Sequence, residues 1–175
     1  MSKNSQAELE QAFIQMIREN EKIIYKVCSF YVSEQSPMED LYQDTVLNLW
    51  KCFPKFRNES SLSTWMYRIA LNSCISSLRK ENKRRQVETQ CLASLQSIVE
   101  TQSIASLPEP DNMEEEIREL YRLIYQLKDL ERAIILLWLE EKSYQEIAEI
   151  TGLSLSNVAT KLKRIKADLK TMSNQ

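Results

Sequence analysis

The chain contains only one glycine and four prolines in 175 residues. Glycine and proline are the residues that most often interrupt helices and form tight turns, so a chain this poor in both favours helices along nearly its whole length. With 43% hydrophobic and 27% charged residues, the composition predicts an all-α protein. Its length allows one or two small domains, each with its own core.

The single glycine, Gly152, separates two segments with helical periodicity. Ser143, followed three residues later by Glu146, predicts a capping box at the start of the first segment. Ser154 is a candidate cap for the second segment. The apolar residues of the second segment recur at helical spacing: Val158, Leu162, Ile165 and Leu169. A short helix, a tight turn at glycine and a second helix are therefore expected.

The opposite face of the second segment is polar and basic. Its residues are Asn157, Ala159, Thr160, Lys161, Lys163, Arg164 and Lys166. A basic outer face on the second helix of such a pair is typical of a helix-turn-helix that enters a DNA major groove. The alternative is a helical hairpin whose lysine-rich face is only solvated, because runs of charge usually mark plain surface.

Charge is distributed unevenly along the chain, although the net charge is only −2. Residues 51–85 contain nine basic and two acidic residues, and residues 156–175 contain five basic and one acidic residue. The segments between and before them are acidic. Two basic islands indicate two separate contacts with nucleic acid. The overall acidity predicts that neither binds DNA strongly alone, so a protein partner is expected.

Residues 86–112 are polar, rich in serine and glutamine, and end near Pro108 and Pro110. This composition predicts a flexible or extended linker. Scattered apolar residues leave a short helix as the alternative: Leu92, Leu95, Ile98 and Val99. The expected organisation is therefore two small helical domains, at residues 1–85 and 113–175, joined by the linker 86–112.

The first domain reads as three or four helices. Leu9, Phe13 and Ile17 form one helical stripe and Ile24, Val27 and Tyr31 form a later one, with a break expected near Asn20 between them. Pro37, at the first helical position, predicts the start of a helix that runs from 38 to about 53. Its core face includes Leu41, Thr45 and Leu49, with Val46 and Trp50 beside them.

The other face of this helix carries Asp40, Gln43, Asp44 and Asn48. The two aspartates have no third metal ligand nearby, so this face is expected to be solvated or to bind a partner.

Residues 54–63 show no strand pattern and predict a loop, and residues 64–85 follow as a helix with a basic end. Aromatic residues lie next to Arg57 and Arg68 in this stretch. Rings can replace lost base stacking, at roughly 1–3 kcal/mol per base, while cations follow the phosphates, so an unpaired strand is a suitable ligand. The alternative is that Trp65 and Ile69 are core residues and the basic end only complements the helix dipole.

Several function classes are disfavoured. The chain has no histidine, no Cys-x-x-Cys pair, no glycine-rich phosphate loop and no convincing carboxylate cluster, so neither an enzyme nor a metal or cofactor site is expected. The four cysteines read as reduced and mostly buried, as in a cytoplasmic protein. No signal sequence and no apolar run near the roughly 20 residues of a membrane span are present, so membrane insertion is not expected.

Two ordered sets of motifs resemble bacterial RNA polymerase sigma factors. Residues 40–44 with Trp50, the pair Phe56 and Arg57, and residues 64–72 are similar to region two of that family. Residues 127–132 and 140–148, continuing to Leu169, are similar to its region four. Both sets occur in the family's order, with its linker between them, and they are most similar to the small extracytoplasmic-function group.

The resemblance implies a sigma factor that binds core RNA polymerase and directs promoter recognition, DNA melting and transcription initiation. It implies docking on the clamp helices of the polymerase β′ subunit, and contact with the β subunit. The implied core-polymerase contacts are Asp40, Leu41, Gln43, Asp44, Leu47 and Asn48.

The same resemblance implies two sets of DNA contacts. The minus-ten set surrounds a specificity loop that takes up one flipped base: Phe56, Arg57, Asn58, Glu59, Ser60, Trp65, Arg68, Asn72, Arg79 and Lys80. The minus-thirty-five set lies on the second helix of the helix-turn-helix: Ser156, Asn157, Thr160, Lys161, Lys163, Arg164 and Lys166.

Two positions depart from the family pattern. Relatives often carry Arg or Lys at the position of Ala159, and many carry Gly at the position of Lys142. We therefore expect weak minus-thirty-five readout, with reliance on the minus-ten element or on another DNA-bound recruiting protein. An anti-sigma factor is a further expected partner. The alternative to the whole reading is a stand-alone helix-turn-helix regulator that binds duplex DNA without polymerase.

Overall fold

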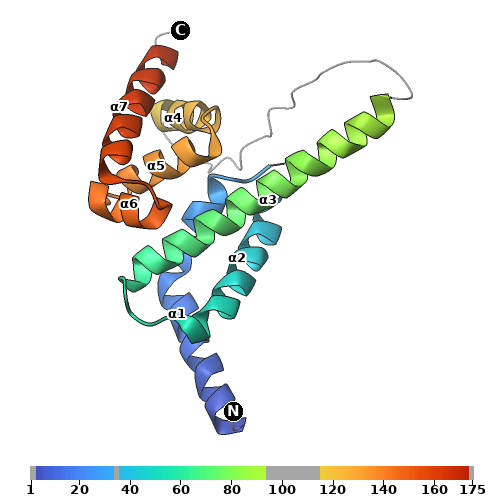
Figure 1. The fold of residues 1–175 in the computed structure, drawn as a ribbon, viewed down its shortest axis with the longest axis vertical. Helices are drawn as coiled ribbons and strands as arrows, with labels where there is room; N and C mark the ends of the chain where they lie inside the picture. The colour runs from blue at the N-terminus through green and yellow to red at the C-terminus, as the bar shows by residue number, and fades with distance from the viewer. Residues whose placement is uncertain (1–2, 34–35, 94–114, 174–175) are drawn as a thin grey trace.

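The computed structural model describes residues 3–33, 36–93 and 115–173, and nearly all of them are helical (Figure 1). The described elements are α1 (Lys3–Ser29), α2 (Met38–Cys52), a short 3-10 turn η1 (Phe53–Lys55), α3 (Leu62–Ala93), α4 (Glu115–Tyr125), α5 (Asp129–Leu139), α6 (Tyr144–Thr151) and α7 (Leu155–Met172). The described residues contain no strand beyond a single bridge between Ser33 and Ser36. The all-α prediction is confirmed. None of the described helices is long and apolar enough to cross a membrane.

The first helical group consists of α1, α2 and α3, which pack pairwise on one another. Helix α1 is broken at Asn20, whose φ of −120° and ψ of 15° are not helical. The Asn20 side chain donates a hydrogen bond of 2.9 Å to the carbonyl of Met16, in competition with the helical backbone. The break expected near Asn20 is therefore present.

Helix α2 presents Leu41, Thr45 and Leu49 to the core, as expected. It begins at Met38, because Pro37 has an extended ψ of 161° and is the cap rather than the first helical residue. The prediction that Pro37 occupies the first helical position was wrong by one residue. Proline is tolerated there because its missing N–H would have no partner at a helix start.

Helix α3 is longer than expected at both ends. Ser61 caps it by accepting a hydrogen bond of 3.1 Å from the backbone N–H of Thr64, so the helix begins at Leu62. It ends at Ala93, so residues 86–93 of the expected linker are helical. The rest of that linker, residues 94–112 with Pro108 and Pro110, lies outside the described residues.

The second helical group consists of α4, α5, α6 and α7. Ser143 and Glu146 form the expected capping box at the start of α6. Gly152 ends α6 in the left-handed conformation, with φ of 74°, and its N–H bonds to the carbonyl of Ala148. Ser154 caps α7 by accepting from the N–H of Asn157. The apolar stripe of α7 is buried as predicted: Val158, Leu162, Ile165 and Leu169.

The two helical groups pack against each other, with α6 beside α3 (Figure 1). A second contact joins the end of α1 to α4 and α5. There the guanidinium of Arg132 donates to the carbonyl of Phe30 at 2.9 Å and lies 5.4 Å from the centre of the Tyr31 ring. The hydroxyl of Tyr31 donates to the carbonyl of Asp129, and that of Tyr125 to the carbonyl of Ser29. These bonds join backbone and side chains that are about a hundred residues apart.

Candidate nucleic-acid interface

One face of α3 carries an aromatic ring, two cations and an amide. At about 100° per residue, Trp65, Arg68, Asn72 and Arg79 fall within an arc of about 60° around the helix. Arg68, Asn72 and Arg79 are exposed, and Trp65 is half-buried. Lys80 is also exposed, although it is turned away from this arc. The helix therefore aligns a stacking surface with groups that can bind phosphates and base edges.

The loop before α3 folds back onto its first turn. The ring of Phe56 packs on that of Trp65, with centroids 4.8 Å apart. Asn58 has φ of 56°, a left-handed conformation that asparagine adopts more readily than most residues. The loop contains no glycine to mark this conformation, so the left-handed backbone at Asn58 has only a weak signal in the sequence.

A cavity of about 620 Å³ lies where the loop meets α3 and α6. The loop and α3 contribute most of its lining: Pro54, Lys55, Phe56, Arg57, Glu59, Ser60, Trp65 and Arg68. Helix α6 contributes Glu149. The structure thus brings six of the ten expected minus-ten residues around one cavity with aromatic, cationic and acidic walls. Asn58, Asn72, Arg79 and Lys80 do not line it. Such a lining suits a planar ring attached to an anionic group.

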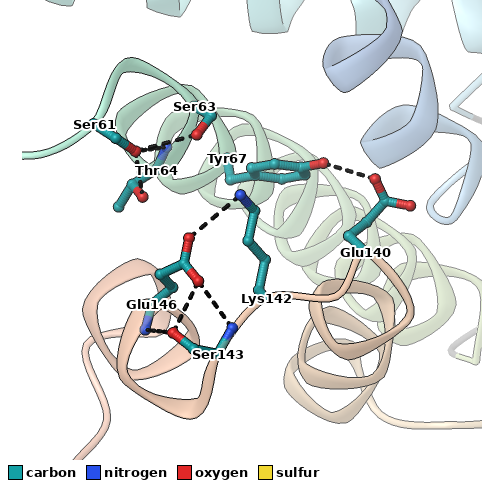
Figure 2. A network of polar contacts seen from close by, with 8 residues as sticks. All are labelled: Ser61, Ser63, Thr64, Tyr67, Glu140, Lys142, Ser143 and Glu146. Carbon is teal, nitrogen blue, oxygen red and sulfur yellow. Dashed lines mark hydrogen bonds and ion pairs between the residues drawn. The ribbon is translucent and has the colours of Figure 1, made fainter.

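A polar network joins α3 to the turn that leads into α6 (Figure 2). The hydroxyl of Tyr67 donates to the carboxylate of Glu140 at 3.0 Å. The ammonium of Lys142 lies 5.7 Å from the centre of the Tyr67 ring and pairs with Glu146 at 3.4 Å. Burial raises the pKa of Tyr67, and the negative charge of Glu140 raises it further. The phenol is therefore protonated at neutral pH and acts as the donor.

Two more contacts complete this junction. The guanidinium of Arg68 donates to the backbone carbonyl of Glu149 at 2.6 Å. The ammonium of Lys26, on α1, pairs with Glu140 at 2.6 Å. The carboxylate of Glu140 therefore accepts a hydrogen bond from Tyr67 on α3 and pairs with Lys26 on α1, two helices of the first group.

The outer face of α7 lies opposite its buried stripe. Ser156, Asn157, Thr160, Lys163 and Arg164 are exposed there, while Lys161 and Lys166 are half-buried. Their charges are partly engaged within the protein. Arg164 lies 3.8 Å from Asp168, and the ammonium of Lys166 lies 3.6 Å from the centre of the Trp138 ring. The face nonetheless presents mainly hydroxyl, amide and cationic groups, which suit base edges and phosphates.

The exposed face of α2 differs in character. Asp40, Gln43 and Asp44 are exposed, and Leu47 beside them is 48% exposed. Asn48 is half-buried and donates a hydrogen bond of 2.8 Å to the hydroxyl of Ser73. Leu41 is only 1% exposed, so its side chain belongs to the core and does not contribute to this face. A leucine surrounded by carboxylates and amides is an arrangement that suits a protein partner.

The described part of the chain shows neither a metal-binding cluster nor a disulfide. Among the described residues, no three His, Cys, Asp or Glu side chains gather as a metal-binding group. Cys28 and Cys74 are buried with their sulfur atoms 3.9 Å apart, and Thr45 lies against both. These two and Cys52 are not disulfide-bonded.

Sequence reasoning missed the residues of the junction: Lys26, Tyr67, Glu140, Lys142 and Glu149. Tyr67, Glu140 and Lys142 lie within the family motifs, but neither motif nor periodicity indicates that these side chains meet across the two helical groups. The only signal in the sequence was Lys142, which stands in this turn where many relatives carry Gly. The left-handed residue of the turn is its neighbour Glu141, with φ of 57°.

Two family models match the chain. The model described as Sigma-70 region 2 matches residues 16–84, and the model described as Sigma-70, region 4 matches residues 117–169. Together they include both basic faces and the acidic face of α2.

Several curated proteins are similar in sequence. The RNA polymerase sigma factor YlaC of Bacillus subtilis is 35% identical over 133 residues, which cover 75% of each chain. The ECF RNA polymerase sigma factor SigG of Mycobacterium tuberculosis is 33% identical over 77% of this chain and 41% of its own, longer chain. The ECF RNA polymerase sigma-E factor of Escherichia coli is 26% identical over 86% of this chain and 80% of its own.

Solved structures share the fold. The sigma factor RpoE of Bartonella quintana, in complex with the anti-sigma factor NepR, superposes with a TM-score of 0.70 at 20% identity, covering 95% of this chain and 97% of that one. CnrH, in complex with the cytosolic domain of CnrY, gives a TM-score of 0.62 at 20% identity, covering 94% of this chain and 89% of that one.

Proposed function

Because this chain belongs to the family of RNA polymerase sigma factors, in its extracytoplasmic-function group, we propose that it binds core RNA polymerase and directs promoter recognition, DNA melting and transcription initiation. The observation that carries this proposal is the pairing of two different nucleic-acid faces in one chain. The α3 face and its loop suit an unpaired strand, while α7 suits a duplex groove. A factor that melts promoters needs both.

The minus-ten element is assigned to the cavity and to the α3 face. A base flipped from the duplex would stack against Phe56 or Trp65, while Arg57 and Arg68 neutralise its phosphates. Opening DNA costs about 1.4 kcal/mol per stacking step, and one captured base returns only roughly 1–3 kcal/mol. A small acidic protein cannot open several base pairs alone, so melting requires the contacts of the whole holoenzyme.

The minus-thirty-five element is assigned to α7, with bases facing Ser156, Asn157 and Thr160 near its first turns. Lys163 and Arg164 would bind phosphates. Ala159 offers no charge, so we propose weak readout of this element. The factor would then depend on the minus-ten element or on a DNA-bound recruiting protein.

The docking face for the β′ clamp helices is assigned to α2, through Asp40, Gln43, Asp44, Leu47 and the exposed part of Asn48. Leu41 is left out because it is buried. Transcription chemistry belongs to the core enzyme, so this chain acts as a non-enzymatic subunit in the cytoplasm. An anti-sigma factor is a proposed partner, since one structural neighbour is a sigma factor in complex with an anti-sigma factor. A stand-alone duplex-binding regulator is not favoured, because it leaves the region-two match and the α2 face without a role.

The deciding experiment is run-off transcription from pooled genomic promoter fragments by purified core RNA polymerase, with and without this protein. We expect discrete new transcripts whose upstream sequences share a minus-ten element. Asp44→Lys should reduce both polymerase binding and transcription at least tenfold. Glu10→Lys, which makes the same charge change at an exposed position of α1, is the control and should leave both unchanged. If the wild-type protein fails to bind core polymerase, the proposal is wrong.

A further inference from the structure

The first residue of α7 is the most exposed of the large apolar side chains in the described part of the chain. Leu155 is 54% exposed, whereas the residues that continue its stripe along α7 are at most 9% exposed: Val158, Leu162, Ile165 and Leu169. A single exposed leucine is ordinary on a protein surface, so its significance depends on where it lies. Leu155 lies on the helix assigned to the minus-thirty-five duplex, and the role inferred for it rests on that proposed function.

The turn before α7 fixes the position of Leu155. Gly152 ends α6 in the left-handed conformation, and Ser154 caps α7 by accepting a hydrogen bond of 3.3 Å from the N–H of Asn157. The carbonyl of Ser154 accepts from the N–H of Val158 at 3.0 Å, and Val158 is fully buried. The first turn is therefore anchored to the core, while Leu155 stays outside it. Because Cα–Cβ bonds tilt toward the N-terminus of a helix, the Leu155 side chain projects toward the end of α7.

This end of the helix is the one that approaches base edges. In a helix-turn-helix, the N-terminal residues of the second helix contact bases in the major groove. Ser156, Asn157 and Thr160 are exposed there and offer hydroxyl and amide groups. Ala159, four residues after Leu155, lies on the same side of the helix as Leu155 and is half-buried. We call Leu155 and Ala159 the apolar pair, which lies next to groups that can form hydrogen bonds.

Among the four bases, thymine alone presents an apolar group in the major groove, its C5-methyl. The other base edges present hydrogen-bond donors and acceptors. A leucine placed against such groups removes their water without replacing the hydrogen bonds, which is unfavourable. Against a thymine methyl, the same side chain takes apolar surface of both partners out of water, which is favourable. The apolar pair therefore favours thymine at one position and disfavours a G·C pair there.

We propose that Leu155, with Ala159 beside it, is a specificity-determining residue that contacts the C5-methyl group of a thymine in the minus-thirty-five element. Burial of one methyl group contributes a factor of about four in affinity. This factor is smaller than the discrimination that a bidentate contact between a side chain and a base supplies. The apolar pair thus gives the minus-thirty-five element a readout that is weak, as proposed above, and that depends on shape and apolar surface rather than on charge.

Deoxyuridine tests this contact, because it pairs with adenine as thymine does and lacks only the C5-methyl group. The thymines in the minus-thirty-five element of a promoter found by run-off transcription are replaced one at a time. The Kd of the holoenzyme for each duplex is measured at one fixed salt concentration. The wild-type chain is compared with Leu155→Ala and with Leu155→Met, which keeps an apolar side chain of similar volume. Leu120→Ala is the matched control, because it makes the same change at an exposed leucine of α4.

For the wild type we expect one position at which deoxyuridine weakens binding about fourfold. Leu155→Ala should bring this ratio to about one, while Leu155→Met and Leu120→Ala should keep it. The Tm of Leu155→Ala should match that of the wild type, because the side chain is exposed. Any effect of deoxyuridine on the duplex itself is common to all variants and cancels in the comparison. The proposal is overturned if no thymine of the element shows the difference, if Leu155→Ala retains it, or if the promoters carry no thymine in this element.

The full chain without polymerase separates this proposal from the proposed function. At low salt, where phosphate contacts are strongest, the free chain and its Leu155→Ala variant are titrated with an alternating A·T duplex and with the A·U duplex of the same sequence. We expect the wild type to prefer the A·T duplex and the variant to lose that preference. A chain that shows the preference but never binds polymerase would refute the proposed function and leave the thymine contact standing. A holoenzyme that transcribes without any such preference would refute the thymine contact alone.

Discussion

Replacing Gly152 by alanine tests whether the turn of the helix-turn-helix depends on backbone conformation alone. At φ of 74° an L-residue with a Cβ pays roughly 1–2 kcal/mol of conformational energy. A Cβ built at this position meets no atom within 4 Å, so no steric clash adds to that figure. Alanine also restricts the unfolded chain, which returns about 0.4–1 kcal/mol. The expected net loss is about 1 kcal/mol, or a shift in Tm of about 2–4 °C for a chain of this size.

The control variants follow from the same reasoning. Gly152→Asn should lose less than Gly152→Ala, because asparagine tolerates the left-handed conformation. Glu141→Gly should act in the opposite direction, since Glu141 has φ of 57° without being glycine. Urea unfolding followed by circular dichroism gives the midpoints. The reasoning is refuted if Gly152→Ala is as stable as the wild type, or if Glu141→Gly and Gly152→Ala shift the midpoint in the same direction.

Two further outcomes are expected. Hydrogen bonds from the Ser143 backbone N–H and hydroxyl lower the pKa of Glu146 in the folded protein. The capping box therefore stabilises the fold fully above the unfolded pKa of glutamate, about 4.3. This stabilisation is lost as the pH falls through the lower pKa of the folded state. Ser143→Ala should therefore cost about 1 kcal/mol at neutral pH and less in acid; equal losses in urea melts at both pH values would contradict this. Ala159→Arg should add a phosphate contact on α7 and steepen the salt dependence of duplex binding by about 0.9 in the log–log slope. Gln11→Arg, at an exposed position of α1, should leave that slope unchanged, and an equal change in both variants would count against α7 as the duplex-binding helix.

Local features of the fold could be predicted wherever they depend on neighbours in the sequence. The capping box at Ser143, the turn at Gly152 and the break at Asn20 each involve groups within a few residues of one another. Helix α2 was predicted to within one residue, because its apolar spacing is clear. The error at Pro37 is the difference between a cap and the first helical residue, which the sequence pattern does not resolve.

Features that depend on distant residues could not be predicted. Lys26 and Glu140 are 114 positions apart, and no pattern within either segment refers to the other. The sequence also left open how the two helical groups sit relative to each other. For α3, the residues after 85 lack a strong apolar stripe, although they contain no proline or glycine to stop the helix before Ala93. Leu41 shows a different problem: the spacing placed it in the core while the resemblance placed it at an interface, and the burial favours the core.

The uneven charge of the chain acquires a structural explanation from the packing of its two groups. The segment 86–155 is strongly acidic; its Glu140 pairs with Lys26 of the first group, and the backbone carbonyl of its Glu149 accepts a hydrogen bond from Arg68. Part of the acidic segment thus packs against α3 and the end of α1. A basic surface that is matched within the chain does not attract nucleic acid strongly in the free protein. A protein with net charge near zero can therefore still carry two basic faces, on α3 and on α7.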